Sequence, residues 1–117
     1  MTVVYRWQDS DGRGPYKPGI SHYWADDNHA ERELPPFFEE FGMGIIKECK
    51  PTECMGCGFR SPDQMQAWFT PAEQERMRLM GYRFGKLIAD RVIAESKRQL
   101  VFVRRQPLRV MFYEVEA

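Results

Sequence analysis

The chain has 117 residues, of which 43% are hydrophobic and 16 are aromatic (8 Phe, 5 Tyr and 3 Trp), enough for one folded core and too apolar for a disordered segment. It contains no run of 18 apolar residues and no charged-then-apolar secretion signal, so we expect a cytoplasmic protein without a membrane span. The formal net charge is zero, but residues 1–75 carry 7 basic and 13 acidic side chains, whereas residues 76–109 carry 10 and 2. This segregation fits either acidic and basic segments that face each other or a cationic surface that attracts phosphate.

The chain opens with an alternating segment, residues 2–8, which predicts a β-strand that carries Arg6 on one face. An arginine is unusual on a face that packs into a core. Residues 9–31 contain several glycines and prolines, which predict turns and an irregular loop. The glycine-rich turn in this loop, Asp11–Tyr16, lets the backbone approach a ligand closely because two of its residues lack side chains.

The middle of the chain predicts a short helix over residues 33–41, ended by Gly42, and a second loop over residues 42–57. Three cysteines lie in or at the end of that loop with the spacing C-x4-C-x2-C: Cys49, Cys54 and Cys57. The spacing permits a structural zinc site, but no paired half-site supplies a fourth ligand. The alternative is three reduced thiols, with Cys57 buried and the other two on the loop.

Two helix starts follow closely. Ser61 is an expected N-cap, with proline at the next position and Gln64 three residues on. Thr70 repeats this pattern with Pro71 and Glu73, and Gly81 ends the second helix.

The last third of the chain predicts extended structure. A segment from Tyr82 is interrupted at Asp90, and two further strands are expected over residues 98–104 and 108–115. Gln99 opens the first of these two strands and shares a face with Val101. At that position the polar side chain either lies at a strand end without a functional role or belongs to a functional site.

Taken in order, several of these segments resemble small bacterial and phage proteins with an ADP-ribosyltransferase-like fold. The segments that carry the resemblance span residues 3–104: Tyr5-Arg6, Asp11–Tyr16, Gly58–Phe69, Gly81-Tyr82 and Arg98–Phe102. In that family three motifs supply an Arg or His, then a Ser, Thr or Tyr, and finally a Glu or Gln at the start of a late strand. The resemblance implies a single α+β domain over residues 1–117, with a split, mostly antiparallel sheet and a few short helices.

The resemblance also implies a site for NAD and a reaction, mono-ADP-ribosylation of a protein or nucleic-acid acceptor. Arg6, Arg13, Tyr16 and Ser61 would bind NAD, and Ser61 and Gln99 would be catalytic. Gln99 stands where the family usually has a glutamate, and an amide cannot supply the negative charge that stabilises a cationic ribose. Ligand binding without transfer is therefore also compatible with the sequence.

Two alternatives come from other classes of protein. One is a non-enzymatic phage protein that blocks a host defence complex, for example an anti-CRISPR protein, because many aromatic side chains and segregated charge suit a binding surface. The other is direct nucleic-acid binding through late arginines with stacking phenylalanines, for which the sequence has no recognised module: Arg98, Arg104, Arg105, Arg109, Phe102 and Phe112. We rank nucleic-acid binding last.

Overall fold

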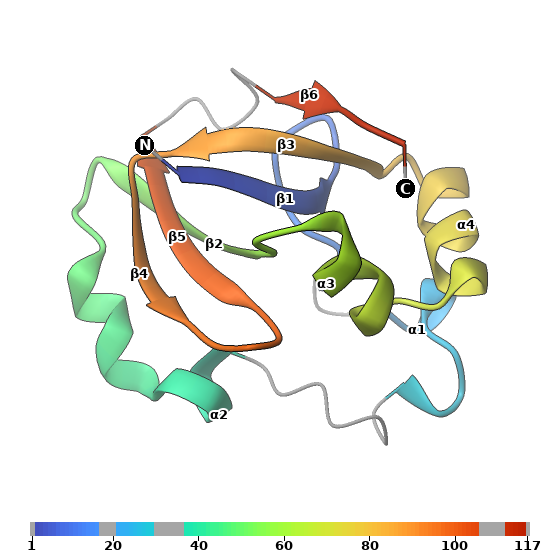
Figure 1. Ribbon diagram of the computed structural model, residues 1–117, viewed down its shortest axis with the longest axis horizontal. Helices are drawn as coiled ribbons and strands as arrows, with labels where there is room; N and C mark the ends of the chain where they lie inside the picture. The colour runs from blue at the N-terminus through green and yellow to red at the C-terminus, as the bar shows by residue number, and fades with distance from the viewer. Residues whose placement is uncertain (1, 17–20, 30–36, 106–111, 117) are drawn as a thin grey trace.

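The computed structural model describes residues 2–16, 21–29, 37–105 and 112–116 (Figure 1). In chain order its elements are β1 (Thr2–Gln8), α1 (Ser21–Trp24), α2 (Phe37–Phe41), the 3-10 helix η2 (Met43–Glu48), β2 (Glu53–Gly58), α3 (Pro62–Trp68), α4 (Pro71–Leu79), β3 (Arg83–Ala89), β4 (Arg91–Glu95), β5 (Leu100–Arg105) and β6 (Tyr113–Glu114).

The strands form two antiparallel three-stranded sheets, one in the order β1-β3-β6 and the other in the order β2-β5-β4. In the first sheet Arg6 lies opposite Gly85, and in the second Gly58 lies opposite Leu100. The two sheets meet where Tyr5 and Phe59 exchange backbone hydrogen bonds of 2.8 and 2.7 Å. β1 therefore borders β2, and the junction between the sheets is lined by both strands.

Side-chain caps explain where α3 and α4 begin. Ser61 accepts a hydrogen bond from the Gln64 backbone N–H at 3.3 Å, as predicted. Thr70 and Glu73 form a complete capping box, since Thr70 accepts from Glu73 N and the Glu73 carboxylate accepts from Thr70 N. Gly81 follows the end of α4 with a φ of 98°, a backbone conformation that favours glycine. Both predicted helices are thus confirmed, with their start signals.

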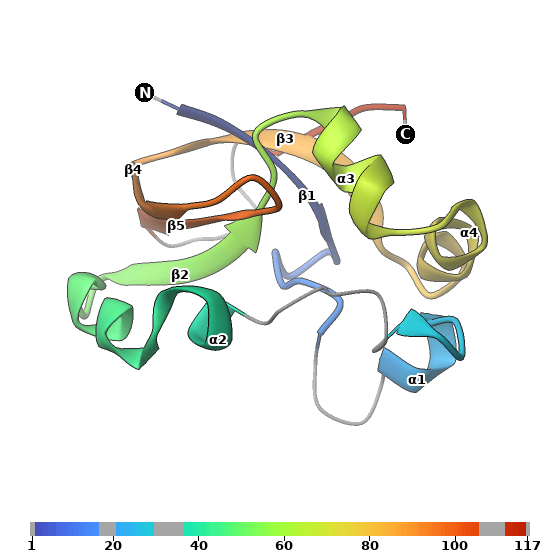
Figure 2. The same cartoon turned by 60° about the horizontal axis from the view of Figure 1, so that its bottom comes forward.

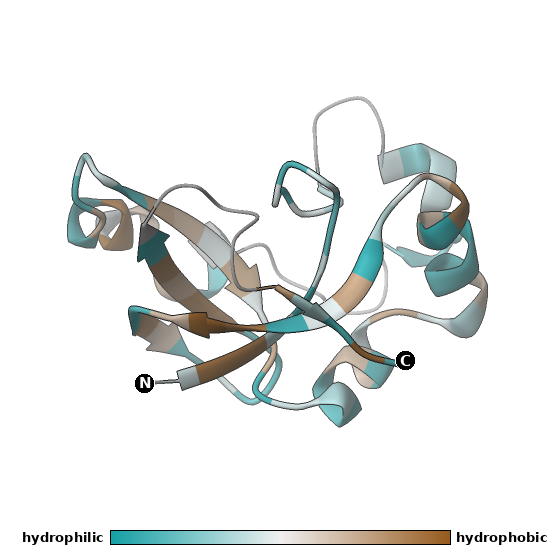
Figure 3. Cartoon of the chain, turned by 90° about the horizontal axis from the view of Figure 1, so that it is seen from above, coloured by the Kyte–Doolittle hydropathy of each residue, from teal (hydrophilic) through white to brown (hydrophobic). Residues whose placement is uncertain are grey.

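Two buried clusters hold the layers together. The larger one packs β1 and β3 against α3 and α4 and is mostly aromatic: Trp7, Trp24, Phe59, Met65, Trp68, Phe69, Met77, Tyr82 and Phe84. The smaller one lies between the two sheets: Val4, Leu87, Ala89, Leu100 and Phe102. Figure 3 shows the hydrophobic residues following the strands while hydrophilic residues dominate the turns. α2 and η2 cover the side of β2 that faces away from β1 and β3 (Figure 2).

The structure confirms part of the predicted architecture and corrects the rest. The α+β class, the mostly antiparallel strands and the strand over residues 2–8 are confirmed. The prediction of a loop over residues 42–57 is wrong, because η2 and β2 lie there, and α1 falls within the expected loop 9–31. The strand expected over 98–104 begins two residues later, and residues 106–111 of the expected last strand lie outside the described residues, as do 33–36 of the expected helix.

Candidate functional site

Arg6 extends from β1 into the junction between the two sheets. The residue is 7% exposed, and its side chain lies over β2, with its Cβ near Gly58 and its guanidinium at Gly56. A Cβ atom at Gly56 would collide with Arg6 Nη1 and with the Phe102 ring, and a Cβ at Gly14 would lie 2.7 Å from Arg6 Nη2. The glycines therefore make the space that the guanidinium fills. Glycines inside a strand signal a close approach of this kind, so Gly56 and Gly58 were a usable sequence signal.

A second buried arginine lies beside the first. Arg104, on β5, is also 7% exposed, and its Nη2 donates to Gly12 O at 2.7 Å and to Gln8 Oε1 at 3.1 Å. The Cζ atoms of Arg6 and Arg104 lie 5.4 and 5.7 Å from the centre of the Phe102 ring, which is fully buried. We call Arg6, Phe102 and Arg104 the arginine pair cluster. The sequence-based site contained Arg6 but neither Phe102 nor Arg104.

The electrostatics of this cluster follow from its burial. Burial, and then repulsion from Arg104, lower the pKa of Arg6 to about 10, while Asp9 and Cys57 act weakly in the other direction. Burial lowers the pKa of Arg104 to about 10. Both guanidinium groups remain charged at neutral pH. Within the described parts of the chain neither forms an ion pair, and Arg6 Nε and Arg104 Nη1 are buried without a hydrogen-bond partner.

The glycine-rich turn lies against both arginines. Asp9 holds it, because its Oδ1 accepts from the backbone N–H groups of Asp11 and Arg13 at 2.9 Å each. Gly12 has a φ of 83°, which a turn of this kind needs from a glycine. The turn thus packs against Arg6, and the Arg13 side chain is exposed.

Gln99 lies on the other side of the second sheet. It is 4% exposed, directly precedes β5, and its Nε2 donates to Glu40 Oε1 at 2.9 Å. Glu40 belongs to α2, which covers the side of β2 that faces away from β1 and β3 (Figure 2). The structure thus directs Gln99 toward α2 and Arg6 into the space between the sheets, and does not bring their side chains together.

Ser61 lies at the same end of the β2–β5 pair as Gln99, since Gly58 is opposite Leu100. Its hydroxyl caps α3. Around it, Gln64 donates to Lys97 O at 3.1 Å, and Arg60 Nε donates to Glu95 Oε2 at 2.8 Å. These contacts fasten the start of α3 to the β4–β5 turn. Hydrogen bonding to Arg60 lowers the pKa of Glu95.

Tyr16 belongs to a separate hydrogen-bonded network. Its hydroxyl accepts from Trp68 Nε1 at 2.7 Å and lies 2.9 Å from His29 Nε2. His29 Nδ1 lies 2.7 Å from Oε2 of Glu73, whose side chain is fully buried. Half of the Tyr16 surface is exposed. No sequence signal pointed to this network, because its members lie up to 57 positions apart (16 to 73).

The cysteines do not gather into a metal site. Among the described residues, no group of three or more His, Cys, Asp or Glu side chains is placed to hold an ion. Cys54 and Cys57 both lie on β2, and an odd separation puts them on opposite faces of the strand. The expectation that Cys54 lies on a loop is wrong, because β2 begins at Glu53. Burial raises the pKa of Cys57 to about 11.

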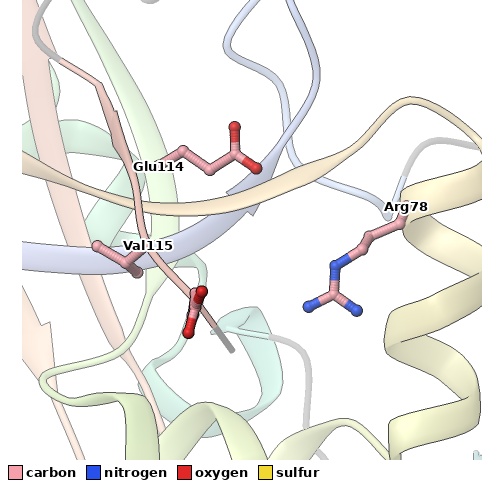
Figure 4. Close-up of a pocket in the computed structure, with 4 residues that line it drawn as sticks. Arg78, Glu114 and Val115 are labelled. Atoms are coloured by element: carbon pink, nitrogen blue, oxygen red, sulfur yellow. The ribbon is translucent and has the colours of Figure 1, made fainter.

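A shallow pocket opens elsewhere, between α4 and the end of the chain (Figure 4). Arg78 reaches into it from α4, and Glu114, Val115 and Glu116 line the opposite side. The Arg78 guanidinium also lies over the Trp7 ring, 5.1 Å from its centre. None of the residues predicted for the NAD site lines this pocket, and its charges are mixed.

These observations define a small α+β domain with a buried pair of arginines between two sheets. The sequence matches the bacteriophage T4 Y00F protein family over residues 1–116, so the chain belongs to that family. No curated protein and no solved structure matches it. In the parts of the chain that the structure describes, no helix has the length and apolar character needed to cross a bilayer.

Proposed function

We propose that this phage protein binds NAD through Arg6 and acts on a host macromolecule in the cytoplasm. The observation that carries the proposal is the Arg6 guanidinium, which is buried between the sheets and forms no ion pair with any described residue. An arginine without a carboxylate partner suits a phosphate-bearing ligand, because the planar guanidinium matches phosphate oxygens. The glycine-rich turn packs against Arg6 through Gly14 and supplies backbone cover for a cofactor, and half of the Tyr16 surface, at the end of that turn, is exposed.

The arrangement of Gln99 favours binding over transfer of ADP-ribose. Transfer from NAD passes through a cationic ribose, which a carboxylate on the same side as the phosphate-binding arginine would stabilise. Gln99 is an amide, and it donates to Glu40 on the side of α2. We therefore infer an ADP-ribosyltransferase-like protein that binds NAD as a ligand and does not transfer ADP-ribose.

The test is calorimetric titration of NAD into the wild-type protein and two variants, Arg6→Met and Arg83→Met. Methionine replaces the aliphatic part of the side chain and removes its charge, and Arg83 is an exposed arginine on β3 that serves as the matched control. We expect binding by the wild type and Arg83→Met and a loss of at least about tenfold in affinity for Arg6→Met, roughly the contribution of one charge-assisted contact. An absence of heat with folded wild-type protein would overturn the proposal. Nicotinamide release by the wild type would instead establish turnover.

A second candidate function is a non-enzymatic inhibitor that binds a host defence complex. It is favoured by the phage family and by an exposed apolar pair on the first sheet, where Val3 lies opposite Ile88 with 43% and 40% of their surfaces exposed. A host protein captured by the wild type and not by Ile88→Lys would support this function. Equal capture by both proteins would count against it.

A further inference from the structure

Two guanidinium groups share one aromatic ring in the interior of this protein. Arg6 comes from β1 in the first sheet and Arg104 from β5 in the second, and both lie within 6 Å of the Phe102 ring centre, at 5.4 and 5.7 Å. Each residue is only 7% exposed. The cluster therefore brings two positive charges from different sheets into one buried space.

This arrangement is unfavourable without an anion. Burial of an unpaired charge is unfavourable, and two like charges close together add to the cost. The partners that the described residues provide are neutral: Gly12 O and Gln8 Oε1 accept from Arg104, and both guanidinium groups contact the Phe102 ring. Asp9 is the one carboxylate in the described residues that acts on Arg6, and it does so weakly and holds the turn.

Two donors in the cluster are available for a ligand. Arg6 Nε and Arg104 Nη1 are both buried and have no hydrogen-bond partner in the described parts of the chain. An unsatisfied donor on a charged group is costly, so two in one cluster point to a missing acceptor. The acceptor must be anionic, because the local charge is positive, and it must offer oxygens to two separate guanidinium groups.

We propose that Arg6 and Arg104 form an anion site that takes the diphosphate group of a small nucleotide. Each arginine presents a planar fork of donors that matches the oxygens of one phosphoryl group, and two forks match two linked phosphoryl groups. This site goes beyond the proposed function, because the arginine pair binds inorganic pyrophosphate whether or not NAD is the natural ligand. It also assigns a ligand-binding role to Arg104.

The glycine-rich turn covers this site. Gly12 O accepts from Arg104, and Gly14 packs against Arg6, so the turn lies on both guanidinium groups. A diphosphate enters when the turn moves away from the cluster and Arg104 exchanges the Gly12 carbonyl for a phosphate oxygen. The glycines permit this movement, because they add no side chain that would block the ligand.

Inorganic pyrophosphate is titrated into four proteins in a calorimeter: the wild type, Arg6→Met, Arg104→Met and the control Arg83→Met. Thermal unfolding of each protein is then measured with and without pyrophosphate. We expect pyrophosphate to bind the wild type and Arg83→Met, to raise their Tm, and to bind at least tenfold tighter than sulfate. Arg6→Met and Arg104→Met are each expected to bind at least tenfold more weakly. Arg6→Met removes a buried charge that donates no hydrogen bond to a described residue and should keep the ligand-free Tm, whereas Arg104→Met leaves Gly12 O and Gln8 Oε1 without their donor and should lower it.

A second measurement uses the wild type alone and so does not depend on the folding of any variant. Arginine Nε–Hε resonances of buried side chains are recorded with and without pyrophosphate, and we expect two of them to shift on binding. Absence of pyrophosphate binding, or equal binding by Arg104→Met and wild type, would overturn the proposal. Pyrophosphate binding without NAD binding would leave this site standing and remove the proposed function. NAD binding that is unchanged in Arg104→Met would leave the proposed function standing and remove this site.

Discussion

The Gln99 amide donates a hydrogen bond to the Glu40 carboxylate across 2.9 Å, and this contact ties the start of β5 to α2. The two residues are 59 positions apart, and Gln99 is almost completely buried. The polar side chain at this strand end therefore has a defined structural partner. Its neutrality matters, because a glutamate at this position would remove the donor and place a second negative charge beside the Glu40 carboxylate.

Gln99→Glu should destabilise the protein at neutral pH by ~1–3 kcal/mol, since it replaces a hydrogen bond to a charged group with repulsion between two carboxylates. Urea unfolding at pH 7.5 measures the loss. The repulsion raises the pKa of one carboxyl in the folded state, so the folded protein binds more protons and the deficit should shrink as the pH falls toward 5.

The double variant Gln99→Glu/Glu40→Gln restores one amide and one carboxylate and should recover most of the stability. A deficit that stays constant with pH would contradict this explanation. Increased NAD cleavage by Gln99→Glu would restore the transferase interpretation.

Features that depend on neighbouring residues, such as helix caps, could be predicted from the sequence. Contacts between residues far apart in the chain could not. Ser61 and Thr70 were identified as caps because the residues that complete a cap lie within three positions. Arg6 was identified as unusual because a charge broke an alternating apolar pattern. Arg104 was not connected to it, because the register that brings β1, β2 and β5 together depends on the Tyr5–Phe59 bridge. β2 was missed because its sequence, Glu-Cys-Met-Gly-Cys-Gly, is poor in the residues that favour strands, and burial against β5 overrides that propensity.

Glu73 should be one of the most sensitive positions in the chain. Its buried carboxylate accepts from the backbone N–H groups of Asp26 and Thr70, each at 2.9 Å, and contacts His29. Glutamine has one acceptor oxygen instead of two, so Glu73→Gln leaves at least one buried donor unsatisfied and should cost ~2–4 kcal/mol. Thermal or urea unfolding measures the effect.

Glu75→Gln is the matched control for Glu73→Gln, because it makes the same change on the same helix. The Glu75 side chain is 65% exposed and lies 3.6 Å from Arg78, so its loss should cost less than about 0.5 kcal/mol. Equal unfolding midpoints for the two variants would show that the Glu73 network does not stabilise the fold.

Cys57 should be a poorly reactive thiol despite its place beside a cation. Burial raises its pKa to about 11, and the nearby positive charge of Arg6 offsets only part of that effect. In a Cys49→Ser/Cys54→Ser background, iodoacetamide should alkylate native Cys57 at pH 7.5 roughly a hundredfold more slowly than the urea-unfolded chain, because the thiolate fraction falls tenfold for each pKa unit. The native rate should still be rising at pH 10. Since the folded state holds this proton more tightly, the contribution of the thiol to stability is present below pH 9 and is lost as the pH rises toward 11.

Arg6→Met removes the positive charge that favours the Cys57 thiolate and should slow the alkylation further, whereas Arg83→Met should leave the rate unchanged. A native rate that levels off near pH 8 would contradict the raised pKa and indicate that the junction between the sheets is open to water.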